Sequence, residues 1–595
     1  MPDPASSVAL EAGPISCVLA NGDLRSIRVD GEEVVQRLYF ALRDGNWGTI
    51  PATLRDLTVT REGGGFKVGY RAEHRTAEIG FSWHAETVGT SEGCLRFSAS
   101  GAATRSFLRN RIGLCVLHPA SAAGHRVRVT HHDGTSCSSA FPLRVSPHQP
   151  FLDICALRHT MASGAVVEFG FEGEVFEMED QRNWTDASFK TYSTPLALPF
   201  PVEMAAGEPL AQAVTITVVE RAPAPRRSTP ATRPLSIVEV QSHARAVPLP
   251  ALGVDLGAES PAFDAPVVTA LSRLSLAHLR LELTLGEAGV AERLEQATGN
   301  ARAVGSPLAL ALRVPPDPGG TLAELARLLG ALRPPLASVA VFSEGAPATT
   351  SRTARSARAA LAGAIGGAPL GGGTRAWFAE LNRNPPEPDL IDFVCYAVSP
   401  QVHAFDDRSV LEALDGQTAT VESAHALFGR LPVHVGPITL RPQWNPDAIG
   451  PAAAPAPGEL PPEVDPRQRL PFAAAWTAAS LKRLALAGAR QVTYFEAVGW
   501  KGLLERSGGS RSPAVFPSRP GERFRVFELL EALAPFAGGT LRVAVAPEGV
   551  EAFAVSAGGR ERLWVANLTP ELQRFRGPGG AGHELSPYAT VWLDA

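Results

Sequence analysis

Two glutamates end short apolar segments that also carry aromatic side chains. Glu380 follows Trp377 and Phe378, and Glu496 follows Tyr494 and Phe495. If both segments are strands of one parallel barrel, their carboxyl ends meet at the same mouth. Two facing carboxylates can divide the work between a proton donor and a base or nucleophile. We therefore predict Glu380 and Glu496 as the catalytic pair; the alternative is that each forms an ordinary salt bridge in the barrel rim.

Other polar side chains follow the predicted strand ends. The ones that we expect to contact a substrate are Asn382, His403, Asp406, Arg441 and Trp500. His403 and Asp406 share a short loop that could orient a base or hold hydroxyl groups, although a lone histidine is more often structural. Arg441 could bind a carboxylate or polarise a carbonyl, or form only a salt bridge at the rim. The second predicted strand adds Arg280 and Glu282.

The segment EDQRNWTDASFKTY, residues 179–192, is unusually dense in hydrogen-bonding side chains with aromatic rings between them. Planar polar groups beside aromatic faces are the usual means of holding a sugar. The members that we expect to contact substrate are Asp180, Arg182, Asn183, Trp184, Asp186 and Lys190. The alternative is a polar interface between two domains, since such groups are costly to bury without partners.

Alternating apolar and helical segments in the middle of the chain must position these groups. Eight short apolar segments are predicted as strands, at 252–257, 278–284, 308–314, 338–343, 375–381, 392–398, 432–440 and 491–498. Amphipathic helical stretches separate them. Eight such units over residues 249–515 predict a (β/α)₈ TIM barrel rather than an open doubly wound sheet. The Pro- and Ala-rich stretch 449–471 is then a long insertion on the catalytic face.

The regions on both sides of this barrel have the period of two that is typical of β-strands. Residues 1–220 predict a large N-terminal β-sandwich, and residues 516–595 predict a small C-terminal β-sandwich. Residues 221–248 are rich in Pro and Arg and predict an extended linker. The fold class is therefore multidomain, α/β plus β, with the barrel as the catalytic part.

The composition excludes several kinds of partner and location. A net charge of -5 without a basic stripe argues against nucleic acid and membrane-surface partners. The first residues lack the basic and apolar regions of a signal peptide, and no apolar run reaches the length of a membrane span. Six scattered cysteines without a C-x-x-C pair favour reduced thiols. We therefore expect a cytoplasmic protein.

Sequence motifs for metals and cofactors are missing. There is no fixed-spacing metal motif, no G-x-S-x-G elbow, no P-loop and no G-x-G-x-x-G turn. His132-Asp133 and the group around His403 contain ligand-type atoms but lack metal-site spacing. We expect neither a metal nor a cofactor.

Several segments together resemble the D-apionate lactonase family. They are HHDGTSCSSAFPLRVSPHQPF, EDQRNWTDASFKTYSTPLALPFPV, FAELNRNPP, SPQVHAFDD and VTYFEAVGWKG, and the resemblance spans essentially the whole chain. It implies hydrolysis of D-apionolactone, a branched sugar-acid lactone, to D-apionate in apiose catabolism. The expected partner is that small substrate. The residue roles above rest on strand-end position and not on the resemblance.

Opening a lactone requires a base that activates water, donors for the oxyanion, and an acid for the leaving alkoxide. Glu380 or Glu496 would serve as base and acid, with Arg441, His403 or Lys190 near the oxyanion. A glycoside hydrolase that uses the same glutamate pair is the first alternative. A non-catalytic sugar-binding protein is the second, and the intact polar set at the strand ends counts against it.

Overall fold

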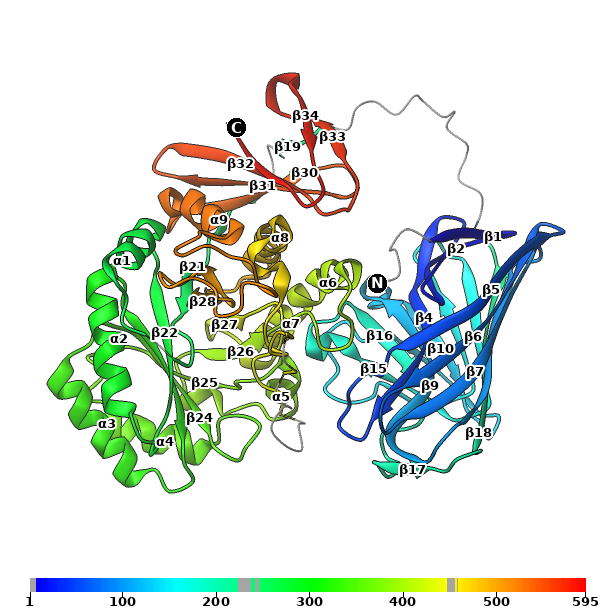
Figure 1. Ribbon diagram of the computed structural model, residues 1–595, viewed down its shortest axis with the longest axis horizontal. Coiled ribbons are helices and arrows are strands. Elements are labelled where there is room, and N and C mark those ends of the chain that lie inside the picture. The colour runs from blue at the N-terminus through cyan, green and yellow to red at the C-terminus, as the bar shows by residue number, and fades with distance from the viewer. Residues whose placement is uncertain are drawn as a thin grey trace. The chain divides into compact units, whose positions relative to one another are not determined.

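The computed structural model describes residues 7–222, 237–240, 245–259, 261–446, 455–456 and 458–594 (Figure 1). The chain divides into two compact units. Among the described residues, the first unit contains 7–182 and 187–222, and the second contains 183–186 and the residues from 237 onward. The predicted linker positions 223–236 and 241–244, and positions 449–454 and 457 of the predicted insertion 449–471, lie outside the described residues.

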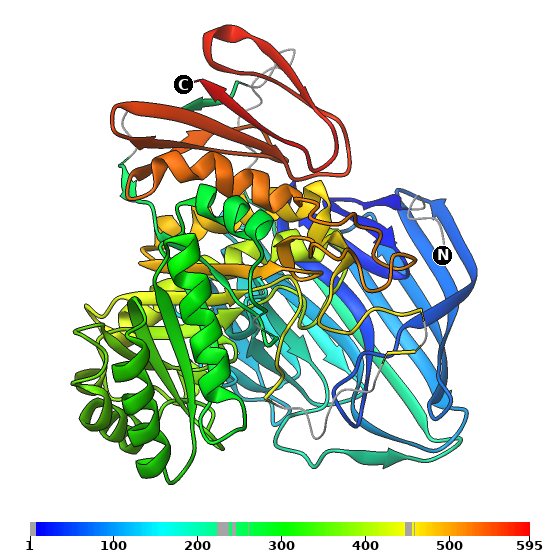
Figure 2. The same cartoon turned by 60° about the vertical axis from the view of Figure 1, so that its left-hand side comes forward.

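The first unit consists of two antiparallel sheets, coloured blue to cyan in Figures 1 and 2. One sheet has the order β1 (Val8–Ala12), β2 (Ile15–Ala20), β3 (Asp23–Val29), β4 (Glu32–Asp44), β9 (Phe107–Pro119), β16 (Ser188–Tyr192), β15 (Phe176–Asp180) and β12 (Phe151–Ile154), with β17 (Val202–Met204) beside β9. The other has the order β11 (Ser136–Ala140), β10 (Arg126–Thr130), β13 (Ala156–Thr160), β14 (Val166–Glu172), β18 (Pro209–Glu220), β8 (Cys94–Ala103), β7 (Gly80–Thr90), β6 (Gly65–Arg75) and β5 (Ala52–Glu62).

Alternation along these strands builds the core of the first unit. In β6, for example, Phe66, Val68, Tyr70 and Ala72 are buried while the residues between them are more exposed. Buried side chains from both sheets form one continuous apolar cluster. This is the sandwich arrangement that period-two patterning specifies.

The second unit contains a closed parallel barrel. Its strands are β21 (Ala251–Asp255), β22 (His278–Thr284), β23 (Leu308–Val314), β24 (Leu336–Ser343), β25 (Leu370–Gly373), β26 (Val394–Val398), β27 (Val433–Ile438) and β28 (Gln491–Val498). Pairing of β21 with β28 closes the ring, and the short β29 (Gly502–Leu504) pairs with β28. The TIM barrel prediction is confirmed.

Helices follow the strands and cover the outside of the barrel, as α1 to α4 do in Figure 1. They are α1 (Ala265–Leu271), α2 (Val290–Val304), α3 (Gly319–Leu332), α4 (Ser351–Leu361), α5 (Phe378–Arg383), α6 (Asp407–Glu412), α7 (Leu414–Phe428), α8 (Pro471–Ala487) and α9 (Arg525–Leu533). Helix α8 is almost fully buried, since its side chains are apolar on nearly every side.

The prediction of residues 375–381 as the fifth strand is wrong. The fifth strand is Leu370–Gly373, a stretch of Leu and three glycines, and Phe378–Arg383 forms the short helix α5. Glycines usually weaken a strand. Here a side chain at Gly371 would lie 2.3 Å from the Phe393 ring, so tight packing inside the barrel requires glycine. Glu380 is therefore a helical residue and not a strand end.

The C-terminal sheet has the order β19 (Glu239–Val240), β30 (Thr540–Val545), β31 (Val550–Ala557), β32 (Arg560–Asn567) and β35 (Thr590–Asp594), with β20 (Val247–Pro248) also beside β30. A hairpin of β33 (Gln573–Arg576) and β34 (Gly582–Leu585) completes the apolar cluster. Part of the predicted linker thus pairs with the C-terminal sheet as β19 and β20. Glu551 of β31 pairs with Lys482 and Arg483 of α8, which ties this sheet to the barrel.

No helix among the described residues is long and apolar enough to cross a membrane.

Candidate active site

A cavity of about 340 Å³ lies at the carboxyl ends of the barrel strands, the position of catalytic sites in this fold. Its volume suits a small ligand. Nine of its lining residues are charged: Asp255, Arg280, Glu282, Glu287, Arg293, Arg313, Arg375, Glu496 and Lys501. Strand ends of β21, β22, β23 and β28 contribute five of these side chains, so the barrel itself holds the centre of the site.

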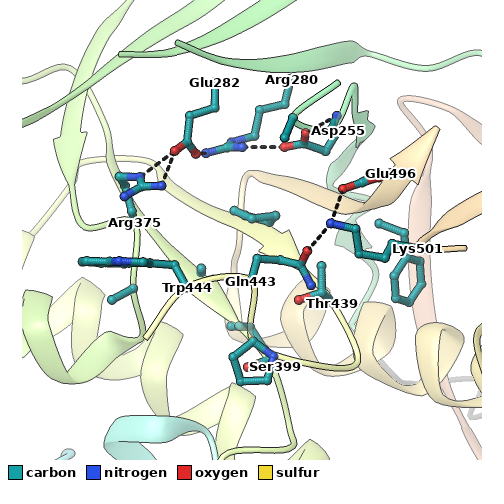
Figure 3. Close-up of a pocket in the computed structure, with 18 of the residues that line it drawn as sticks. Asp255, Arg280, Glu282, Arg375, Ser399, Thr439, Gln443, Trp444, Glu496 and Lys501 are labelled. Carbon is teal, nitrogen blue, oxygen red and sulfur yellow. Dashed lines mark hydrogen bonds and ion pairs between the residues drawn. The ribbon is translucent and has the colours of Figure 1, made fainter. Parts of the chain in front are cut away.

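A chain of ion pairs runs along one wall (Figure 3). Arg280 pairs with Asp255 on one side and donates to Glu282 Oε2 at 2.7 Å on the other. Arg375 Nε then donates to Glu282 Oε1 at 2.6 Å and stacks over Trp444. Burial alone would raise the pKa of Glu282, but Arg280 and Arg375 outweigh it and hold that pKa below its usual value. Glu282 therefore stays ionised and fixes two guanidinium groups.

Glu496 lies beside Asp255, at the end of this chain of ion pairs, and has its own partner (Figure 3). Lys501 Nζ lies 2.7 Å from Glu496 Oε1 and donates to Gln443 Oε1 at 2.7 Å. Burial raises the pKa of the Glu496 carboxyl; Lys501 opposes this rise, and Asp255 adds to it. A carboxylate with a raised pKa at a cavity wall is suited to accept a proton and to return it.

A β-bulge aims Glu496 at the cavity. Gly253 of β21 pairs with Thr493, but Asp255 pairs with Glu496, so β28 has one residue more than β21 over this stretch. Phe495 takes a positive φ of 51° there, which is rare for an aromatic residue. Tyr494 bonds to Ser480 of the outer helix α8. In a regular strand residues 494 and 496 point to the same side, so Glu496 would point outward, as Tyr494 does. The extra residue of the bulge turns the Glu496 side chain toward the cavity instead.

Gly257 makes room for the Glu496 carboxylate. Its φ is +75°, and a Cβ atom there would lie 2.8 Å from Glu496 Oε2. We expect Gly257→Ala to displace this carboxylate and to lower kcat/KM by on the order of 10²-fold, as misplacement by about 1 Å does. Backbone strain should also lower stability by roughly 1–2 kcal/mol. Steady-state kinetics and thermal unfolding check both effects.

Gly305→Ala is the matched control for this prediction. Gly305 caps α2 with a φ of +80°, and nothing lies within 4 Å of a Cβ added there. It carries the same backbone strain without a clash at the cavity. Equal losses of activity in the two variants would contradict the placement of Glu496.

The predicted catalytic pair does not share this cavity. Glu496 lines it, whereas Glu380 lies in α5, is 6% exposed and is not among the lining residues. Asn382 of the same helix donates to Asn183 at 3.0 Å. The carboxylate that pairs with Glu496 across neighbouring strands is Asp255 instead.

The other predicted strand-end residues have structural partners outside the cavity lining. His403 pairs with Asp186 at 2.6 Å and contacts Trp184 edge-on. Asp406 caps α6 by accepting from the Ser409 amide. Arg441 pairs with Asp465 at 3.5 Å. Trp500 lines a second, neighbouring cavity.

The segment 179–192 is divided between the two units. Asp180 and Arg182 form a fully buried ion pair in the first unit, where Arg182 also donates to the Pro142 carbonyl at 2.8 Å. Lys190 pairs there with Glu179. Residues 183–186 group with the second unit. Among the described residues, none of this segment lines the 340 Å³ cavity.

Sequence reasoning missed several cavity residues for identifiable reasons. The sequence pattern places Arg375 inside a strand, whereas it lies between β25 and α5, and Lys501 lies three residues beyond the end of β28. Asp255 closes the first strand, so inspection of every strand end would have found it. Trp444 lies just beyond the seventh predicted strand, whereas Gln443 gave no signal of its own.

No group of three or more His, Cys, Asp or Glu residues in the described ranges is arranged to hold a metal ion.

The fold is a TIM barrel, and its cavity at the strand ends is lined by carboxylates and fixed cations. Comparison with known proteins gives the family. The chain matches the D-apionate lactonase N-terminal domain over residues 2–221, its TIM barrel domain over 252–538 and its C-terminal immunoglobulin-like domain over 547–593. It is also 30% identical to the D-apionate lactonase of Brucella anthropi, across 98% of this chain and 96% of that protein. The chain belongs to the D-apionate lactonase family.

Solved structures with a similar arrangement include two glycosidases. A family 51 α-L-arabinofuranosidase from Bifidobacterium longum is 11% identical, with a TM-score of 0.43 over 61% of this chain and 95% of that one. A GH30 endoxylanase from Clostridium papyrosolvens C71 is 11% identical, with a TM-score of 0.37 over 61% and 97%. At these scores the similarity carries no functional argument.

Proposed function

We propose that this protein hydrolyses D-apionolactone to D-apionate in apiose catabolism. Membership of the D-apionate lactonase family makes it a hydrolase of lactone ester bonds. In the proposed reaction a water oxygen adds to the lactone carbonyl carbon, the bond to the ring oxygen breaks, and that oxygen takes a proton. The substrate is a small molecule, and we place the reaction in the cytoplasm.

The observation that carries this proposal is the position of Glu496. Its carboxylate is 18% exposed, lines the cavity and has a raised pKa. As a base it would take a proton from the attacking water, and as the resulting acid it would return a proton to the leaving ring oxygen. One group can thus serve both steps, because the two proton transfers follow each other.

Fixed cations around the cavity supply the other requirement. The developing oxyanion needs donors that are already in place, since preorganised charge is the largest contribution in most acyl transfers. Lys501 is held between Glu496 and Gln443, and Arg375 is held between Glu282 and Trp444. We assign Lys501 to the oxyanion and Arg375 to the substrate hydroxyls and the carboxylate of the product.

Glycoside hydrolysis is the second candidate, and the Asp255–Glu496 pairing is the observation that favours it. The two residues are Cα partners on neighbouring strands, so their Cα atoms lie about 5 Å apart. Both side chains line the same cavity, and retaining glycosidases likewise place two carboxylates in one site. Asp255, however, is already engaged by Arg280 and by the Gly257 amide. Lactone hydrolysis needs only one carboxylate that exchanges a proton, and Glu496 with its raised pKa fits that need better.

Side-by-side assays with D-apionolactone and aryl glycosides test the proposal. We expect the purified protein to release acid from the lactone, measured by proton release at constant pH, and to release no aryl alcohol from the glycosides. Aryl alcohol release without acid release would overturn the lactonase assignment in favour of the glycosidase.

A further inference from the structure

A second cavity of about 230 Å³ adjoins the catalytic one. Four residues line both: Gly257, Ala258, Glu496 and Lys501. The proton-transferring carboxylate therefore stands where the two spaces meet. Each space has access to the same reacting group from a different side.

Trp500 forms a fixed aromatic wall of this second cavity. Its Nε1 donates to Ser510 Oγ at 3.0 Å, and its indole stacks on Phe516 with ring centroids 5.7 Å apart. Pro461 and Val464 add apolar surface. Because two contacts hold the indole in one orientation, a flat ring can stack on it with little loss of side-chain entropy.

The second cavity also has a charged side, formed by two arginines that pair with one carboxylate. Arg506 lies 2.8 Å from Glu259 Oε2, and Arg511 pairs with the same oxygen. This charged rim suits a ligand that carries hydroxyl groups in addition to its ring.

Hydrolysis of a five-membered lactone does not require the second cavity. Its acyl carbon and its leaving oxygen belong to one ring, so both stay in the same cavity throughout the reaction. An open-chain ester differs, because its alcohol separates from the acid when the bond breaks. Such an alcohol needs room on the far side of the catalytic carboxylate, and the second cavity lies there.

We propose that the enzyme also hydrolyses open-chain esters of hydroxy acids whose alcohol carries a ring, with the acid in the first cavity and the alcohol stacked on Trp500. This inference rests on the proposed lactonase chemistry. Water adds to the acyl carbon, the bond from that carbon to the alcohol oxygen breaks, and the oxygen takes the proton that Glu496 removed from water. The products are the hydroxy acid and the free alcohol, with no other reactant.

Benzyl glycerate and methyl glycerate are suitable probes, since glycerate has no hydroxyl group able to close a five-membered lactone. For the wild-type protein we expect kcat/KM for the benzyl ester to exceed that for the methyl ester about tenfold, as ring stacking and burial allow. In Trp500→Ala the ratio should fall to near one, and Trp500→Phe should keep most of it.

Arg511→Ala gives an independent test if Trp500→Ala fails to fold, because Arg511 is 57% exposed and lines only the second cavity. It should lower kcat/KM for 4-hydroxybenzyl glycerate relative to benzyl glycerate about twofold to threefold, because a guanidinium donor to the ring hydroxyl is lost. Arg525→Ala is the matched control, with an equally exposed arginine that pairs with Glu528 in α9. Hydrolysis of D-apionolactone by a protein with equal activity on the benzyl and methyl esters would overturn this inference alone. Absence of lactone hydrolysis would instead overturn the proposed function.

Discussion

Glu496→Gln is expected to lower kcat for lactone hydrolysis by on the order of 10²- to 10³-fold while the fold is retained. Glutamine keeps the shape of the side chain but can neither accept nor return the proton, and general acid–base catalysis is worth about that much. The variant also loses the pair with Lys501, whose side chain is 24% exposed. Burial raises the pKa of Glu496 in spite of Lys501, so a neutral amide in place of the ionised carboxylate should cost little stability. Single-turnover kinetics and a thermal unfolding curve measure the two effects separately.

The pH dependence of the wild-type protein tests the same assignment. A general base must be ionised, so kcat/KM should fall as the pH drops through the pKa of Glu496. An unperturbed glutamate has a pKa of about 4.3. Because burial raises the pKa of Glu496, the acidic limb of the pH profile should lie above that value. The limb should be absent from the residual activity of Glu496→Gln. An unchanged limb in that variant would assign it to another group.

Glu380→Gln separates the sequence-based pair from the cavity geometry. A catalytic partner of Glu496 would lose activity to a similar degree when changed. Since Glu380 does not line the cavity, we expect a smaller loss than in Glu496→Gln, whereas Asp255→Asn should lower kcat by at least tenfold by disturbing the ion-pair chain. Equal losses of kcat in the Glu380→Gln and Glu496→Gln variants would support the sequence-based prediction that these two glutamates are the catalytic pair.

Arg280→Ala is expected to have the largest effect on stability, about 3–5 kcal/mol. The guanidinium is 9% exposed and contacts both Asp255 and Glu282. Removing it leaves two carboxylates in the barrel wall without this partner, and an uncompensated buried charge costs this much. Denaturant unfolding monitored by intrinsic fluorescence measures the loss. Arg525→Ala, at an exposed position, should stay within about 0.5 kcal/mol of the wild type.

The charge of the two carboxylates, and not the missing volume, should cause this loss. Adding Asp255→Asn and Glu282→Gln to Arg280→Met should therefore recover much of the stability, because neutral groups replace the unpaired charges. The pH dependence has a definite sign. In the wild type the pKa of Glu282 is lowered in the folded state, so its ionised form stabilises the fold at pH values above the pKa of an unfolded glutamate. This stabilisation is lost as the pH falls through the lowered pKa of Glu282. The gap between wild type and Arg280→Ala should shrink as the pH falls, and a constant gap would point to packing instead.

The amino-acid sequence by itself determined the architecture. Period-two alternation specified the first unit, and apolar segments separated by helical ones specified the barrel. The strands β22, β23 and β28 begin and end where the pattern predicts. These patterns are local, since each strand's own residues decide which face is buried. Glu496 was identifiable for the same reason, as a carboxylate near the end of a clear strand.

Only the tertiary structure decided which residues form the site. The fifth strand, with its three glycines, has no strand pattern, and packing against Phe393 and the neighbouring strands creates it. The direction of Glu496 depends on a bulge whose extra residue is defined by pairing with β21. The chain of Asp255, Arg280, Glu282 and Arg375 joins residues up to 120 positions apart and exists only because the closed ring brings their strands together. Spacing along the sequence does not give the distances between residues across a barrel. The surroundings of Glu496 therefore could not be predicted without the closed ring of strands.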